Sequence, residues 1–306
     1  MASRRFRIGT RTSRLALIQT HMVVDALRAA DPNAADYIEI VELSSNGDQD
    51  RTKSLEALGG RGIFTDGIDR AVAFGEIDLA VHSVKDLPAQ LQTGITLVAA
   101  LEREDPRDAF VAPNWSSIAA LPKGAIMGSA SVRRTAFLKR LRADVRFSLL
   151  RGNVDERVVA LDTGPAQGTI LAVAGLKRLG LAGHIKETLS VSHMPPDPGQ
   201  GAIGITCRAD DFVVRRLTSR INHPPTYAAV LAERAILTEI IGSCAYPLGA
   251  LAVTNQDSLR LMAVLVKEDG SRTVTADVLG AVGRAEDVGR RAAQSLLAAA
   301  VKELAA

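Results

Sequence analysis

The sequence predicts an α/β fold with two α/β domains, followed by a smaller α+β domain. Three observations support this prediction. Short apolar runs alternate with helical patterns over residues 5–101, and the same alternation restarts at residue 125. The C-terminal part instead carries consecutive strand-like runs and one long Ala-rich helical pattern. The chain has 306 residues, of which 47% are apolar and 23% charged, so it can fill several cores of ordinary size.

The first domain is predicted from its alternation of strands and helices. RFRIGT (5–10) is typical of a strand, and residues 13–30 are typical of a helix that Ser13 caps at its N-terminus. Short links between such elements favour a largely parallel sheet covered by helices. The further elements expected here are strands at 37–43, 77–84 and 95–101 and a helix at 64–76.

The second domain follows a possible hinge at 102–108, EREDPRD, and ends in a Pro/Gly-rich joint at 193–201, HMPPDPGQG. Its expected elements are strands at 125–130, 145–150 and 168–175 and helices at 131–142 and 153–162, with a short helix after the last strand.

The remaining elements complete the predicted domain division. A buried strand is expected at 202–208, then helices at 210–220 and 224–240, strands near 248–254, 258–266 and 273–279, and an amphipathic helix at 285–303. We therefore expect domain 1 to comprise 1–101 with 200–220, domain 2 to comprise 102–199, and domain 3 to comprise 221–306.

Composition excludes several classes of protein. Two cysteines cannot form a disulfide framework and fit a reducing cytoplasm, and the N-terminal residues lack the apolar core of a signal peptide. No apolar run is long enough to cross a membrane. The five histidines and two cysteines lack zinc spacing, so no metal is expected. Phosphate-loop and dinucleotide fingerprints are absent, and few aromatic residues accompany the basic ones, which argues against nucleic-acid binding.

Polar and basic residues follow the predicted strands where a ligand site is expected. In open α/β sheets, ligands bind at the carboxyl ends of strands and at the N-termini of the helices that follow. Asp86 is the only acid in this group, so it is the natural proton handler among groups suited to an anionic ligand. The group consists of Arg11, Ser13, Lys85, Asp86, Ser129, Ser131, Arg133, Arg134, Arg151, Asn153 and Arg157.

Each of these residues also has a purely structural interpretation. Ser13 and Ser131 could serve only as helix N-caps, and Lys85 with Asp86 could form a surface ion pair worth about 0.5 kcal/mol. His82 could be a packed strand residue. The basic run at 131–157 could be a solvated helix face. Their joint placement at strand ends favours a site for a polyanion.

Cys244 is a further candidate for a chemical role. Cys207 lies in an apolar run, where a small hydrophobic residue would serve, but Cys244 lies in the turn-like stretch GSCAYPLG. A thiol in a turn near positive charge is the reactive kind, so Cys244 is either a harmless thiol, a nucleophile or a covalent attachment point.

Several long motifs, in one order, resemble the porphobilinogen deaminase (hydroxymethylbilane synthase) family. They are RIGTRTSRLALIQ, AVHSVKDLP, EREDPRDAFV, GSASVRR, LLRGNVDER, ILAVAGLKRLGL, GQGA and AERAILTEIIGSCAYPLGA, and they cover essentially the whole chain. The resemblance implies two domains like those of periplasmic binding proteins around a cleft, and a third domain that presents a cofactor. It also implies a cytoplasmic monomer.

The activity implied by the resemblance is a transfer reaction of tetrapyrrole biosynthesis, the pathway that leads to haem. Four porphobilinogen units are joined head to tail with loss of ammonia and released as hydroxymethylbilane. Cys244 is then the thioether anchor of a dipyrromethane cofactor, and Asp86, held by Lys85, stabilises the cation formed as ammonia leaves and handles the proton.

The resemblance also assigns the binding residues. Cofactor contacts are expected from Ser83, Lys85, Asp86, Ser129, Ser131, Arg133, Arg134, Arg151 and Gly152. Substrate contacts are expected from Arg11, Ser13, Gln19, Arg151, Arg157, Arg178 and Gln200, and a lid over the cleft from Gly59, Gly60, Arg61, Gly62 and Phe64.

Three positions depart from the family's usual pattern. Ser243 stands where glycine is frequent, Ala130 where a hydroxyl residue is common, and Arg61 where lysine is common. If the turn at position 243 needs a positive φ, serine costs about 1 kcal/mol there.

Two rival functions stay open from the sequence. A non-catalytic anion-binding or sensor protein on the same scaffold would explain the arginines but leave Asp86 and Cys244 without a role. A cysteine-dependent hydrolase would need a histidine near Cys244 in space.

Overall fold

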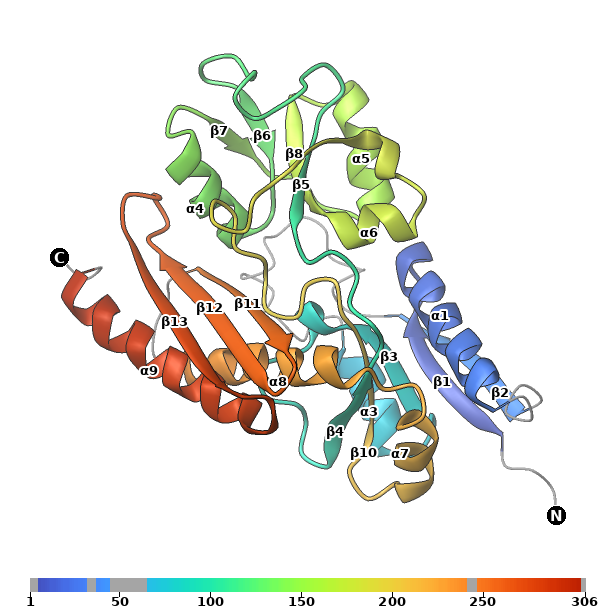
Figure 1. Cartoon of the computed structure of the whole chain (residues 1–306). Helices are drawn as coiled ribbons and strands as arrows, with labels where there is room; N and C mark the ends of the chain where they lie inside the picture. The colour runs from blue at the N-terminus through green and yellow to red at the C-terminus, as the bar shows by residue number, and fades with distance from the viewer. Residues whose placement is uncertain (1–4, 32–36, 45–64, 241–246, 304–306) are drawn as a thin grey trace. The chain divides into compact units, whose positions relative to one another are not determined.

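The structure, a computed structural model, describes residues 5–31, 37–44, 65–240 and 247–303 (Figure 1). The chain divides into two compact units, Met1–Arg103 with Ala202–Tyr227, and Glu104–Gly201 with Ala228–Ala306. We call them unit 1 and unit 2. The division into three domains stays a prediction. No helix in the described ranges is both long and apolar enough to span a membrane.

Unit 1 is built on a five-stranded sheet in the order β2-β1-β3-β10-β4. The strands β1 (Phe6–Arg11), β2 (Ile38–Leu43) and β3 (Leu79–Ser83) run parallel, as predicted. The strand β10 (Ile203–Arg208) runs antiparallel to both β3 and β4 (Ile95–Ala100), so the sheet is mixed.

The helices of unit 1 follow from capping and periodicity. The helix α1 (Arg14–Ala30) begins where Ser13 Oγ accepts a hydrogen bond from the amide of Ala16 at 3.3 Å, which confirms the predicted N-cap. Val23 and Leu27 of α1 lie in one core with Ile8, because residues four apart share a helix face. The other helices are α3 (Asp66–Ala73) and α7 (Phe212–Thr218), and the helix α8 (Pro224–Ile240) begins here.

Unit 2 contains a second five-stranded sheet, in the order β7-β6-β8-β5-β9. The strand β6 (Ile126–Gly128) pairs in parallel with β7 (Arg146–Ser148) and β8 (Gly168–Ala172). Three helices accompany these strands: α4 (Val132–Leu141), α5 (Val154–Thr163) and α6 (Val173–Arg178).

Two strands of this sheet were absent from the sequence-based prediction. They are β5 (Asp108–Val111) and β9 (Ile185–Thr188), and β5 pairs antiparallel with both β8 and β9. All four residues of β5 are buried, so it lacks the alternation of a half-buried strand. It also starts with the last residue of the segment expected to be a hinge.

The C-terminal elements of unit 2 form a separate antiparallel sheet. The strands β11 (Leu248–Asn255), β12 (Ser258–Val266) and β13 (Thr273–Ala281) pair in chain order, and α9 (Ala285–Glu303) packs on β12 and β13 (Figure 1). This confirms the expected α+β character of the tail. Gly289 of α9 allows close approach to α8, because a Cβ there would lie 2.6 Å from the Cβ of Ala235.

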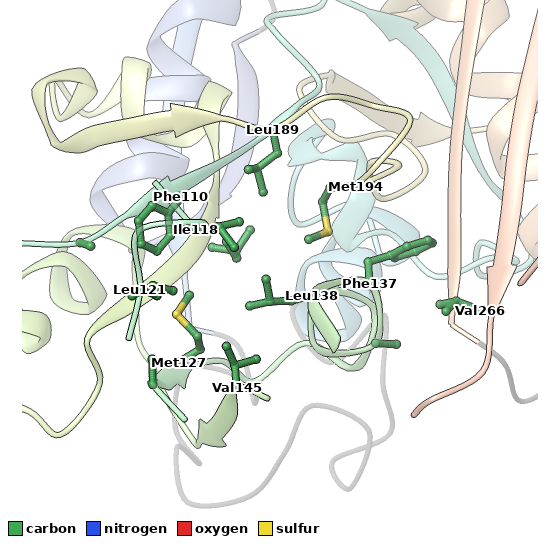
Figure 2. Packing of buried hydrophobic residues seen from close by; sticks show 14 residues of the cluster. Phe110, Ile118, Leu121, Met127, Phe137, Leu138, Val145, Leu189, Met194 and Val266 are labelled. Atoms are coloured by element: carbon green, nitrogen blue, oxygen red, sulfur yellow. The ribbon is translucent and has the colours of Figure 1, made fainter. Parts of the chain in front are cut away.

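The core of the second sheet extends to this tail. Phe110, Met127 and Phe137 are buried together, and Val266 of β12 belongs to the same cluster (Figure 2). The apolar contact therefore joins α4 to the antiparallel sheet and holds the two parts of unit 2 together.

Replacing Phe137 with Ala tests this core. The side chain is 1% exposed, so we expect the free energy of unfolding, measured by urea denaturation, to fall by about 3–5 kcal/mol. Val159 of α5 is 65% exposed, and its replacement with Ala should change the same quantity by no more than about 0.5 kcal/mol. Equal losses in the two variants would contradict the packing.

Candidate functional site

The predicted residues of unit 1 lie at the carboxyl ends of parallel strands. Arg11 is the last residue of β1, and Ser83 is the last residue of β3. Ser83 Oγ and the side-chain amide of Gln19 exchange hydrogen bonds at 2.9–3.0 Å. Gln19 is 3% exposed, so this pair fixes the start of α1 against the end of β3.

Lys85 and Asp86 lie in a 3-10 turn, η3 (Val84–Asp86), directly after β3. Val84 and Leu87 are fully buried and anchor the turn on both sides, while Asp86 is only half-buried. The chain thus presents the Asp86 carboxyl group from a rigid support and leaves it accessible.

His82 precedes this turn and is a packed strand residue. It is 5% exposed, and its Nε2 lies 3.0 Å from the Thr206 hydroxyl of β10. The structural interpretation of His82 is therefore correct.

In unit 2, two predicted loops lie side by side at the ends of β6 and β7. The amide of Ser129 donates to the carbonyl of Ser148 at 2.9 Å, and the amide of Leu150 donates to the carbonyl of Ser129 at 3.4 Å. Ser131 caps α4, accepting from the amide of Arg134 at 3.3 Å. These contacts bring Ser129 and Ser131 close to the loop that carries Arg151.

The loop after β7 has a shape that only glycine accommodates easily. Gly152 has a φ of 119°, and a Cβ there would lie 2.7 Å from a carboxyl oxygen of Glu156. Arg157 Nε donates to the carbonyl of Gly152 at 2.6 Å. Arg151, Gly152 and Arg157 therefore form one local unit, with Arg151 and Arg157 both half-buried.

Arg133 and Arg134 converge on a buried carboxylate, Asp108 of β5. Arg133 Nη2 lies 2.6 Å from one oxygen of Asp108, and Arg134 Nη2 lies 2.8 Å from the other. Gln200 also donates to Asp108, at 3.0 Å. Asp108 and Gln200 are fully buried, and each arginine is 7% exposed.

The charges of this cluster are stabilised by each other. Burial by itself lowers the pKa of Arg133, but attraction to Asp108 and Asp197 and the hydrogen bond to Asp108 outweigh burial, so the pKa is raised. Arg133 therefore stays a cation inside the protein.

Sequence reasoning missed Asp108. It placed Asp86 as the only acid among the basic residues, whereas the structure adds a second acid that contacts three of the predicted residues. The available signal was an aspartate directly before the apolar run AFVA, since an acid at the start of a buried strand needs a cationic partner.

Arg178 differs from the other arginines of unit 2. Its Nη2 donates to the carbonyl of Gly201 at 2.7 Å, but its buried Nε has no hydrogen-bond partner among the described residues. Burial lowers its pKa to about 10, and attraction to Glu104 only partly opposes this. Glu104 itself forms its ion pair with Lys177, at 2.7 Å.

These observations test whether unit 2 suits a group that carries carboxylates. A partly buried guanidinium whose buried Nε has no partner lacks a strong acceptor, and a carboxylate is the acceptor that matches the two parallel N–H donors of a guanidinium. Arg133 also has a buried Nε for which the described part of the chain offers no hydrogen-bond partner. The donor set therefore fits a group that carries carboxylates.

Other predicted residues lie outside the described ranges. They are Cys244 with Ser243 and the lid residues Gly59, Gly60, Arg61, Gly62 and Phe64. Among the described cysteines, Cys207 is buried in β10, and burial raises the pKa of its thiol to about 11. The described residues contain no cluster of three or more groups that could hold a metal ion.

The contrast between Arg178 and Arg133 gives a test by substitution. A base whose pKa is lowered by folding destabilises the folded state at every pH below that lowered value. We therefore expect Arg178→Met to leave the free energy of unfolding at pH 7 within about 1 kcal/mol of wild type, or to raise it.

Arg133→Met is the matched comparison, because it removes a direct partner of Asp108. It should lower the free energy of unfolding by about 3 kcal/mol or more in urea denaturation. A loss for Arg178→Met as large as that for Arg133→Met would show that Arg178 is structural.

The solved structures to which the chain is similar share little sequence with it. A YaeC-family lipoprotein from Enterococcus faecalis is 15% identical with a TM-score of 0.41, over 72% of this chain and 92% of that chain. A periplasmic binding protein of Salmonella typhimurium with high arginine specificity is 12% identical with a TM-score of 0.43, over the same shares of the two chains.

Sequence comparison identifies the family. A porphobilinogen deaminase of Chromobacterium violaceum is 42% identical over 299 residues, which cover 98% of this chain and 96% of the relative. The family model for the dipyromethane cofactor binding domain of porphobilinogen deaminase matches residues 6–216, and that for its C-terminal domain matches residues 227–298. Together with the Asp86 turn and the arginine-rich loops, these matches show that the chain belongs to the porphobilinogen deaminase family.

Proposed function

We propose that this chain joins four porphobilinogen units head to tail, releases one ammonia per unit, and liberates the linear product hydroxymethylbilane. It is thus a transferase of tetrapyrrole biosynthesis. The family matches over nearly the whole chain support this activity. At the level of individual residues, the proposal rests on Arg178. It is a partly buried cation whose Nε has no hydrogen-bond acceptor among the described residues.

The growing chain is a polycarboxylate, because each pyrrole unit bears an acetate and a propionate. Arginine binds a carboxylate through two parallel N–H donors, so several arginines on rigid supports are needed. The residues proposed for this role are Arg11, Arg133, Arg134, Arg151, Arg157 and Arg178, with Ser13, Gln19, Ser83, Ser129, Ser131, Gly152 and Gln200 as neutral partners.

The structure divides these arginines into two kinds. Arg133 and Arg134 already hold Asp108, so they can offer a ligand only those N–H groups that Asp108 leaves unused. Arg178 has no such partner in the described chain. We therefore assign the stronger carboxylate contact in unit 2 to Arg178.

In each addition, Asp86 stabilises the positive charge and accepts the proton that is lost. The C–N bond of the aminomethyl group breaks, ammonia leaves, and the pyrrole ring carries the positive charge that remains. A carboxylate that accepts a hydrogen bond from the pyrrole N–H stabilises that charge. A C–C bond then forms to the next ring, and the proton lost from that ring needs an acceptor within reach, which Asp86 supplies. Lys85, its neighbour in η3, holds it in position.

A dipyrromethane, when bound, supplies the pyrrole terminus on which the product is built. We assign its covalent attachment to Cys244, because the other cysteine, Cys207, is buried in a strand with a raised pKa. The lid role of residues 59–64 and the effect of Ser243 stay predictions. The proposal includes a monomeric enzyme. It also includes a cytoplasmic location, which the sparing use of cysteine supports.

The covalent attachment is tested by the intact mass of the denatured protein. Wild type, after incubation with porphobilinogen, should carry extra mass equal to two linked pyrrole units, and Cys244→Ser should run at the polypeptide mass. Cys207→Ser is the control and should keep the extra mass. A wild-type protein that never gains this mass would remove the cofactor from the proposal.

Asp86→Asn separates an enzyme from a binding protein. The amide keeps the size of the side chain but loses the negative charge, so we expect turnover of porphobilinogen to fall by about 10²-fold or more. The covalent mass of the cofactor should remain. Asp25 lies on α1, and its side chain is 73% exposed, so Asp25→Asn should keep wild-type turnover. Full activity in Asp86→Asn would refute the assigned role.

A further inference from the structure

Glu233 is a fully buried acid that the proposed reaction does not use. It lies in the middle of α8, and its side chain is 0% exposed. Both of its carboxyl oxygens accept hydrogen bonds from main-chain amides. Oε2 accepts from Gly199 at 2.6 Å, and Oε1 accepts from Ala252 at 2.8 Å.

These two amides belong to segments that are far apart in the sequence. Gly199 lies in the Pro/Gly-rich joint at 193–201, where it has a φ of 80°. Ala252 lies in the middle of β11. One carboxyl group thus ties α8, the joint and β11 together.

The joint and β11 also contact each other directly. The amide of Ala250 donates to the carbonyl of Pro196 at 2.8 Å. A Cβ at Gly249 would lie 2.7 Å from the carbonyl oxygen of Pro195, so only glycine permits this approach. The carboxyl group of Glu233 therefore reinforces the contact between the joint and β11, which the Ala250–Pro196 hydrogen bond and the close approach of Gly249 make independently.

The other side of the joint contacts the arginine cluster. Arg133 Nη1 donates to the carbonyl of Pro195 at 2.6 Å. Gln200, at the end of the joint, binds both the carbonyl of Pro106 and Asp108. Residues 195–200 are therefore bonded to Glu233 on one side and to Arg133 and Asp108 on the other.

We propose that Glu233 is a positioning residue, which holds α8 and β11 in register with the arginine cluster of Asp108. This inference rests on the proposed function. The helix α8 ends at Ile240 and β11 begins at Leu248, so the two elements that flank the position of Cys244 in the sequence are joined through the carboxyl group of Glu233. Glu233 would set where the growing product starts relative to the arginines that hold its carboxylates, and a misplaced start would slow addition.

Glutamine cannot replace this carboxyl group. A glutamine side chain has one acceptor oxygen, and its NH₂ group would face an N–H donor at Gly199 or Ala252. Glu187 offers a control in the same unit, because among the described residues its side chain accepts a single main-chain bond, from the amide of Ile118 at 2.9 Å. A glutamine at position 187 can still accept that bond.

The test compares Glu233→Gln with Glu187→Gln and wild type, all carrying the cofactor as judged by intact mass. We expect kcat for porphobilinogen to fall by at least tenfold in Glu233→Gln, with KM within twofold of wild type. Hydrogen exchange should become at least tenfold faster at whichever of the two amides, Gly199 or Ala252, faces the NH₂ group of the glutamine. Glu187→Gln should match wild type in kcat and in both amides.

The proposal is overturned if Glu233→Gln keeps kcat within twofold of wild type, or if Glu187→Gln loses as much. If Glu233→Gln does not fold, Glu233→Asp is measured by the same criteria, because a shorter carboxyl group cannot reach both amides. A wild-type protein that releases no ammonia from porphobilinogen would refute the proposed function instead, and the exchange data would then still show whether Glu233 holds the two segments.

Discussion

The ion pairs between Asp108 and the two arginines Arg133 and Arg134 are the constraint on which the rest of unit 2 depends. Asp108 is completely buried, and an isolated carboxylate in that place would be strongly unfavourable. Two guanidinium groups and the Gln200 amide satisfy it, which requires α4, β5 and the end of the 193–201 joint to meet at one point. The strand β5 carries Asp108 and lies between β8 and β9, so the same interaction connects the sheet to the arginine-bearing helix.

The arginines of unit 2 differ in the groups that neutralise their charge. Because of this difference, we expect some of them to stabilise the fold and others to bind a ligand. Arg133 has a permanent protein partner, and the attraction of nearby acids outweighs its burial. Arg178 has a carbonyl partner and a lowered pKa. A protein that keeps a poorly compensated cation in its interior gives up stability at that position, and ligand-binding sites are where such residues are retained. These observations support the proposal that Arg178 binds an anionic group of the substrate.

Local signals in the sequence were sufficient for the elements and for part of the site. Ser13 and Ser131 precede amphipathic runs, and both cap the helices that were predicted. Strand ends located Asp86, Ser129 and Arg151 because parallel strands present their carboxyl ends at one edge. The strands β5 and β9 and the antiparallel direction of β10 were not predictable in this way, since four-residue strands carry little periodicity and direction is decided by pairing with distant residues. The resemblance to a family supplied Arg178 and Gln200, which the strand-end argument did not reach.

Dependence on partners that are distant in the sequence also explains why Asp108 and Glu233 were missed. A buried acid is recognised by its partners, and these lie 25 or more positions away for Asp108 and 19 or more for Glu233. The joint itself is suited to such partners. Pro195 and Pro196 have no N–H, so their buried backbone offers only carbonyl acceptors. These carbonyls accept hydrogen bonds from Arg133 and from the amide of Ala250. Gly199 supplies one of the main-chain donors that Glu233 accepts, at a φ that favours glycine. Proline and glycine in this segment therefore do more than mark a turn: they determine which neighbours can bond to it, and so connect the arginine cluster to the elements on either side of Cys244.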